Sequence, residues 1–201
     1  MLLELGGVRL LTDRCCVPGS HISGDMPPPA ADAAQHVDAV LISHMHLDHL
    51  DLPSLRSLDG SFRLLVPRGA GHFLRRKGFA GRADRVVMRV THSVYFARDT
   101  DLFDGMDRLG PDLDVALLPV WGWGPTLGRG HLDPERAARA AQLLQPRLAV
   151  PIHWGTFFPR GRRKRDRLTA PPREFAKRVA DLAPDVNVRV VEPGGSLALT
   201  G

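Results

Sequence analysis

The sequence predicts an α/β or α+β fold, because runs of strand length alternate with helical patterns along its 201 residues. The strand-like runs are short, apolar and rich in β-branched residues. The helical patterns begin at capping signals, of which Asp133-Pro134-Glu135 is a clear example. Because 43% of the residues are hydrophobic and no Ser/Gly-rich or acidic linker divides the chain, we expect residues 1–201 to form one domain.

The elements can be placed in order from these patterns. The expected strands are residues 2–5, 8–11, 37–42, 62–66, 85–90, 93–97, 115–118, 148–152, 186–190 and 197–200. The expected helices are residues 52–58, 71–77, 134–144 and 172–182. Residues 24–34, which include three successive prolines, are expected to form a loop between an N-terminal hairpin and the third strand.

Three histidines and a carboxylate follow the third strand within six residues, in the run His44-Met45-His46-Leu47-Asp48-His49. His44 and His46 are two residues apart, so in an extended segment they point the same way and can share one metal ion. Asp48 and His49 lie past a bend and can reach a second ion. Imidazole and carboxylate ligands suit zinc, and manganese and iron accept the same donors. A surface histidine cluster is the alternative interpretation of this run.

Two further expected strands are followed by residues of types that commonly bind metals. His153 follows the strand at residues 148–152, and Asp99 follows the strand at residues 93–97. Alone, either residue is more typical of a cap or a turn. Because both stand at strand ends like His44, we expect them to join the same site.

The run from His44 to His49 resembles the signature of the metallo-β-lactamase-fold hydrolases. The resemblance extends over most of the chain, and in particular to a branch that contains N-acylphosphatidylethanolamine phospholipase D-like and L-ascorbate-6-phosphate lactonase-like proteins. The segments that carry it further are Leu11-Thr12-Asp13, Tyr95 to Thr100, Asp114 to Val120, His131 to Ala137 and Pro151 to Phe157. The resemblance implies a four-layer αββα sandwich, here slightly truncated.

The resemblance also implies the ligands and the chemistry. His44 and His46 would hold the first metal, Asp48, His49 and His153 the second, and Asp99 would bridge them. Two ions, expected to be zinc, would activate water for hydrolysis of a phosphodiester, lactone or related ester or amide. Asp48 would also orient the water, and His131 is the candidate substrate contact or proton donor. A solvent-exposed loop histidine is the alternative for His131.

The chain departs from the family pattern in two places. The family supplies another histidine to the first metal, and the segment that would hold it, residues 78–92, is short here. The candidates to replace that histidine are His72, His92 and His131, although His92 would lie roughly 23 Å from Asp99 along a continuous strand. In addition, Arg98 stands where the family has glycine, and its charge would either weaken metal binding or contact a substrate phosphate.

Charge and targeting signals define the remaining expectations. The net charge is +5, and residues 160–167 hold six Lys or Arg and one Asp. Such a run is usually solvated, but it also suits an anionic small-molecule or lipid-like substrate. The second hypothesis is a nuclease-like hydrolase of the same fold, to which this run would draw nucleic acid. No signal peptide, membrane-spanning run or disulfide framework is recognisable, which favours the cytoplasm. A non-catalytic, vestigial member of the family that lacks one ligand is the third hypothesis.

Overall fold

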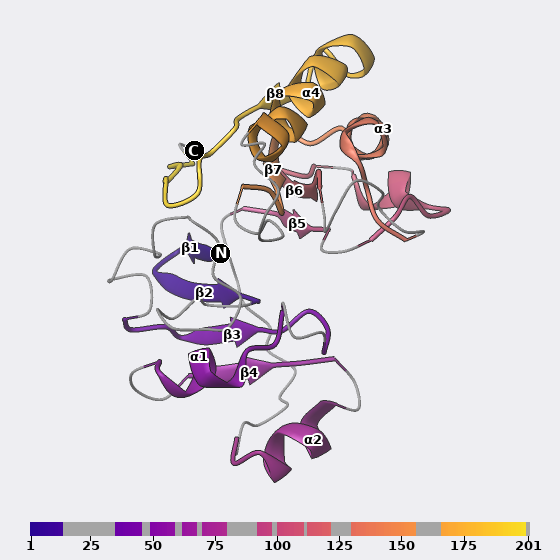
Figure 1. The fold of residues 1–201 in the computed structure, drawn as a ribbon. Coiled ribbons are helices and arrows are strands. Elements are labelled where there is room, and N and C mark those ends of the chain that lie inside the picture. Colours follow the sequence, from indigo (N-terminus) through magenta and orange to yellow (C-terminus); the bar gives the residue numbers. More distant parts are fainter. Residues whose placement is uncertain are drawn as a thin grey trace. The chain divides into compact units, whose positions relative to one another are not determined.

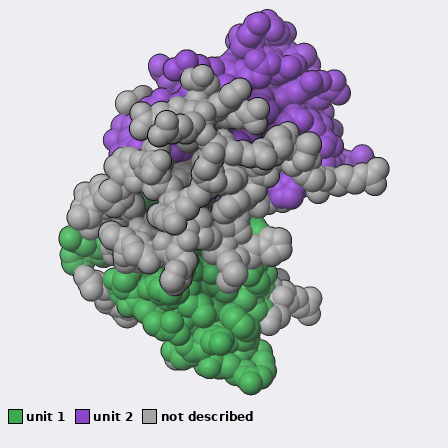
Figure 2. All heavy atoms as spheres, in the orientation of Figure 1, with its two compact units in different colours: residues 1–21, 28–91 green, residues 22–27, 92–201 purple. Residues whose placement is uncertain are grey.

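The computed structural model describes residues 1–13, 35–45, 49–58, 62–67, 70–79, 92–97, 100–110, 112–121, 130–155 and 166–199. The chain divides into two compact units, unit 1 with residues 1–21 and 28–91 and unit 2 with residues 22–27 and 92–201 (Figure 2). Within the described residues, each unit contains a four-stranded sheet and helices, which confirms the mixed α and β class (Figure 1). That residues 1–201 act as a single domain stays a prediction.

The sheet of unit 1 has the strand order β1-β2-β3-β4. Strands β1 (Leu2–Leu5) and β2 (Val8–Thr12) form an antiparallel hairpin. Strands β3 (Ala39–Leu41) and β4 (Arg63–Leu65) continue the sheet in parallel with β2. The carboxyl ends of β2, β3 and β4 therefore lie at one edge of the sheet.

Two short helices cover the apolar side of this sheet. Helix α1 (Leu52–Arg56) begins at Asp51, whose carboxylate accepts the backbone N–H of Ser54, and has Pro53 in its first turn, as the sequence predicts. Helix α2 (Ala70–Arg76) follows β4. Ala70 and Leu74 of α2 belong to the same apolar core as Val40 and Ile42 of the sheet.

The sheet of unit 2 has the order β5-β6-β7-β8, and all of its strands are parallel. The strands are β5 (Val94–Phe96), β6 (Val115–Pro119), β7 (Leu148–Ile152) and β8 (Asn187–Val188). Helices α3 (Pro134–Leu144) and α4 (Asp166–Leu182) connect β6 to β7 and β7 to β8, and they pack against each other and the sheet (Figure 1). These are two successive βαβ units, which again place three strand ends at one edge.

The structure corrects three expectations at element ends. Helix α4 begins at Asp166 rather than at residue 172, so that Pro171 and Pro172 lie inside it and their missing N–H groups remove two helical bonds. Residues 197–199 form no strand, and Leu197 is exposed rather than packed on a partner. A short 3-10 helix, η1 (Met106–Leu109), was not expected. The expected strand at residues 85–90 and Thr200 lie outside the described residues.

Gly110, directly after η1, packs against the carboxyl end of α3 so closely that an added Cβ would clash with the Leu144 carbonyl oxygen. We expect Gly110→Ala to lower the free energy of unfolding by about 1–3 kcal/mol, because backbone must move to admit the methyl group. Urea unfolding measures this change. In the control Gly71→Ala, the added Cβ meets only the flexible Arg75 side chain, so that variant should be neutral or stabilised by about 0.5–1 kcal/mol. Equal stability of Gly110→Ala and the parent would contradict the prediction.

Candidate metal centre

In unit 1 the carboxyl edge of the sheet brings together two histidines, a serine and an aspartate. Asp13 directly follows β2, and Ser43 and His44 follow β3 with one residue between. The Asp13 backbone N–H donates to the Leu41 carbonyl, and Asp13 has a left-handed backbone with φ of 54°. Parallel pairing of β2 and β3 thus places the Asp13 side chain beside the histidine segment.

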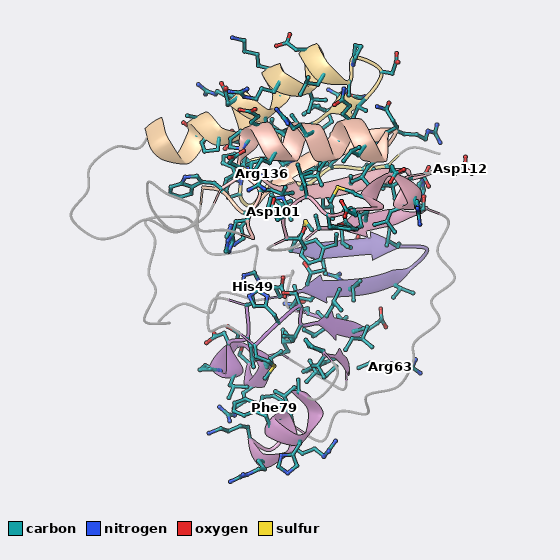
Figure 3. The ribbon with its side chains drawn as sticks, turned by 90° about the vertical axis from the view of Figure 1, so that its right-hand side faces the viewer. His49, Arg63, Phe79, Asp101, Asp112 and Arg136 are labelled. Carbon is teal, nitrogen blue, oxygen red and sulfur yellow. The ribbon has the colours of Figure 1, made fainter. Side chains whose placement is uncertain are left out.

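The Asp13 carboxylate holds this group together. Its Oδ1 accepts the backbone N–H of Ser43 at 2.8 Å, and its Oδ2 lies 3.2 Å from Nδ1 of the buried His49. The Ser43 hydroxyl lies 3.0 Å from Nδ1 of His44 and 3.3 Å from Nδ1 of His49. The two imidazole rings are tilted, with centroids 4.0 Å apart. Both histidines are therefore anchored through Nδ1 (Figure 3 labels His49).

The charge of Asp13 determines the tautomer of His49. Burial raises the pKa of the Asp13 carboxyl, but hydrogen bonds from His49 and Ser43 outweigh it, so that the pKa lies below its ordinary value of 3.8. An ionised carboxylate only accepts hydrogen bonds, so His49 donates its Nδ1 proton to Asp13 and the neutral ring has its lone pair on Nε2. A ligating histidine commonly has this carboxylate–histidine arrangement.

A second anchored histidine lies at the carboxyl edge of the sheet in unit 2. His153 directly follows β7, and its Nδ1–H donates to the carbonyl oxygen of Trp121, two residues past β6, at 2.6 Å. Its backbone is left-handed, with φ of 61°, which is uncommon outside glycine and often marks functional sites. The lone pair of the neutral His153 ring is thus on Nε2, as in His49.

The described residues contain part of the predicted site. His44 and His49 come together in unit 1, whereas His153 and His131 belong to unit 2. His46, Asp48 and Asp99, as well as Arg98, lie outside the described residues. Across the part of the chain that is described, no group of three or more His, Cys, Asp or Glu side chains converges to hold a metal. The complete ligand set therefore stays a prediction.

Three histidines were candidates for the missing ligand. His72 is exposed on α2. His92 precedes β5, and its charge is one of the causes that lower the pKa of Asp114, which lies just before β6. His92 is therefore at the amino edge of the sheet. His153 is at the opposite edge, roughly 16 Å away along the five residues of β7. His131, just before α3, is the remaining candidate at the carboxyl edge.

The sequence analysis missed Asp101, which fixes the backbone next to His131. Its Oδ1 lies 2.7 Å from Nη2 of Arg136, in the first turn of α3, and accepts the backbone N–H of Leu102 at 2.7 Å. Its Oδ2 accepts the backbone N–H of Gly130 at 3.3 Å. Asp101 thereby ties the segment after β5 to the loop before α3 (Figure 3). An acid and a cation 35 residues apart gave no sequence signal, although Asp101 stands two residues after Asp99.

From the sequence, Trp121, Trp123, Phe157 and Phe158 are candidates either for an apolar wall of a substrate pocket or for caps on the core, and the structure describes one of them. Trp121 is half-buried against the core of unit 2, so its side chain has a structural role while its carbonyl holds His153. The other predicted wall residues, Trp123, Phe157 and Phe158, lie outside the described residues.

Similarity to known proteins shows the family of this chain. Residues 9–91 and 84–154 match the beta-lactamase superfamily domain. The chain belongs to the metallo-β-lactamase-fold hydrolase superfamily. Within it, the chain is 37% identical to a UPF0173 metal-dependent hydrolase of Caldivirga maquilingensis, over 98% of this chain and 93% of that protein. It is also 32% identical to the uncharacterized protein Mb0930 of Mycobacterium bovis, over 78% of this chain and 56% of that protein.

A solved structure supports the same assignment. The metallo hydrolase Igni18 of Ignicoccus hospitalis is 25% identical and superposes with a TM-score of 0.70, over 97% of this chain and 91% of that one. The chain spans about half the length of the first curated relatives that it matches, such as the mycobacterial protein. Among the helices that the described residues form, none has the length and apolar character needed to cross a membrane.

Proposed function

We propose that this chain is a metal-dependent hydrolase whose site lies at the carboxyl edges of its sheets. One observation carries the proposal: His49 and His153 each follow a parallel strand, and an oxygen acceptor holds Nδ1 of each. Donation from Nδ1 places the lone pair of a neutral imidazole on Nε2, which is the atom through which we propose that each ring binds a cation. The names of the relatives, which include metal-dependent hydrolases, support the proposal.

The donor types that the sequence supplies, imidazole and carboxylate, suit the dinuclear, zinc-type centre that we propose. We assign His44 and His46 to one ion, Asp48, His49 and His153 to the other, and Asp99 to both. Bound there, zinc would polarise the attacked phosphoryl or carbonyl oxygen and lower the pKa of water. Of the chain's own residues, Asp48 would hold the attacking water, and Asp13 and Trp121 would keep the ligating rings oriented.

His131 is the candidate for contacting the substrate or protonating the leaving group. It stands two residues before Asp133, whose carboxylate accepts the backbone N–H of Arg136 and caps the start of α3. The Asp101–Arg136 pair and the hydrogen bond from Gly130 to Asp101 fix the backbone on both sides of it. Asp101 and Arg136 are thus positioning residues for His131. An anionic phosphodiester or lactone is the proposed substrate class.

Metal analysis of the purified protein tests the proposal. We expect close to two equivalents of zinc or manganese, and turnover of a generic phosphodiester or lactone that chelation removes and added metal restores. His46→Ala should abolish this turnover and lower the metal content. One equivalent or none, with no turnover on any such ester, would favour the vestigial hypothesis instead. Salt-sensitive cleavage of nucleic acid, lost with the same variant, would favour the nuclease hypothesis.

A further inference from the structure

Helix α2 of unit 1 presents a basic and aromatic surface to solvent. Ala70 and Leu74 anchor the helix in the core, and Leu74 is only 2% exposed. The remaining side chains point outward: Phe73 is 44% exposed, and Arg75, Arg76 and Lys77 are all exposed. A large exposed ring beside consecutive cations is not required by the fold of this helix.

Among the residues that the structure describes, these cations have no acidic partner. Within the described part of the chain, Arg75, Arg76 and Lys77 form no ion pair with a carboxylate, whereas Arg136, Arg139 and Arg178 of unit 2 each do. The local sequence has the same imbalance, because residues 62–92 hold eight Lys or Arg and a single acid, Asp84. The charge of this stretch, +7, exceeds the +5 of the whole chain. Positive charge concentrated in this way attracts anionic partners.

Contacts with aromatic rings hold two of the cations in place. The guanidinium of Arg56, at the end of α1, lies 5.4 Å from the centroid of the Phe79 ring and donates to the Lys77 carbonyl at 3.2 Å. The ammonium of Lys77 lies 5.8 Å from the centroid of the Phe73 ring. Figure 3 labels Phe79 beside α2 and shows the side chains of this helix projecting from the unit. Arg56, Phe73, Arg75, Arg76 and Lys77 together form a surface that we call the α2 surface.

We propose that the α2 surface docks on an anionic phospholipid bilayer. Cations at the level of the phosphates and an exposed ring at the acyl boundary are the two contributions that bind a peripheral protein to such a membrane. Single-stranded nucleic acid is the competing partner, but a base could stack on the Phe73 face only by displacing Lys77. A bilayer takes up the ring with the ammonium left at the headgroups. This inference does not depend on the proposed hydrolase activity.

Cosedimentation with vesicles tests the docking. We expect the full chain to bind vesicles of equimolar phosphatidylcholine and phosphatidylserine, to lose binding at high salt, and to ignore phosphatidylcholine alone. Each cation near an anionic surface changes binding about fivefold, so the double variant Arg75→Gln and Arg76→Gln should bind about 25-fold more weakly. Phe73→Ser should also weaken binding, because it removes the ring.

A matched control removes the same charge from another helix. Arg173 and Lys177 are exposed on α4 and one turn apart, and the double variant Arg173→Gln and Lys177→Gln should bind like the parent. Circular dichroism checks that each variant is folded. Absence of binding to the anionic vesicles, or an equal loss in the α4 variant, would overturn the proposal. Salt-sensitive binding of an oligonucleotide, lost in the α2 variant without any vesicle binding, would identify nucleic acid as the partner instead.

Discussion

Replacing Asp13 by asparagine is expected to lower metal affinity by about 10–100-fold while the fold is kept, because the two side chains have the same shape. The asparagine amide oxygen can still accept the Ser43 backbone N–H that now bonds to Oδ1. Its NH2 group then faces Nδ1 of His49, 3.2 Å from the present Oδ2. Nδ1 must accept a hydrogen bond in that arrangement, so the proton moves to Nε2 and removes the lone pair that a cation needs.

Compared with Asp13→Asn, the variant Asp13→Ala should lower the free energy of unfolding as well as the metal affinity. It leaves the backbone N–H of Ser43 and Nδ1–H of the buried His49 without their carboxylate, at a cost of roughly 1–3 kcal/mol for each unsatisfied group. Because the pKa of Asp13 is lowered, its contribution to stability is present above pH 3.8 and is lost as the pH falls through the lower, folded-state pKa. A metal-free protein should therefore be measured at neutral pH.

Titration with zinc under a competing chelator measures the loss of affinity, and urea unfolding measures stability. Asp38→Asn is the matched control, because Asp38 also accepts a backbone N–H, that of Arg9 at 2.8 Å, but stands at the amino end of β3. That variant should bind metal like the parent. If Asp13→Asn also bound zinc with unchanged affinity, the assignment of His49 Nε2 as a ligand atom would be wrong.

Helices and strands could be predicted from the sequence where their own residues determine where they begin and end. Helix α3 and strand β7 occupy the predicted residues, since Asp133 and Pro134 begin the helix and Gln145 ends it with a left-handed backbone. Helix α4 was mispredicted because Pro171 and Pro172 are typical of a helix start, whereas here the helix begins one and a half turns earlier. The capping residues thus determine where α3 begins, whereas the proline pair does not determine where α4 begins.

The candidate site was predictable only in its residue types. A strand followed by His44 and His49, and another followed by His153, indicates donors at a sheet edge, and the structure places these residues there. The hydrogen bonds that orient the rings were not predictable. Asp13 and Ser43 are 30 residues apart and Trp121 and His153 are 32 apart, so their contacts depend on which strands become neighbours. Strand order is a property of the whole fold and leaves no local pattern.

Substitutions at His131 and at the ion pair beside it are expected to produce the second large effect, a loss of kcat. His131→Gln is expected to lower kcat by about 10²–10⁴-fold, the usual contribution of a general acid, if the proposed hydrolase protonates its leaving group there. Arg136→Met, which keeps the length of the side chain, should lower kcat by about tenfold with KM and metal content unchanged, because a loosened loop misplaces His131. The Arg136 and Asp101 side chains are 41% and 23% exposed, so their ion pair should contribute at most about 1 kcal/mol to stability. A tenfold change in kcat would therefore report position rather than unfolding.

Two measurements together test whether the Asp101–Arg136 pair positions His131. They are steady-state kinetics on the metal-loaded enzyme and the NMR signals of the His131 ring. Arg139→Met is the control, since Arg139 lies one turn further along α3 and pairs with Glu135 instead, at 3.2 Å. Its kcat and its His131 signals should match those of the parent. Asp101→Asn should resemble Arg136→Met, and the double variant should be no worse than the more affected single variant, because both changes break the same bond. Additive losses, or an unmoved His131 signal in Arg136→Met, would show that the pair does not act through His131.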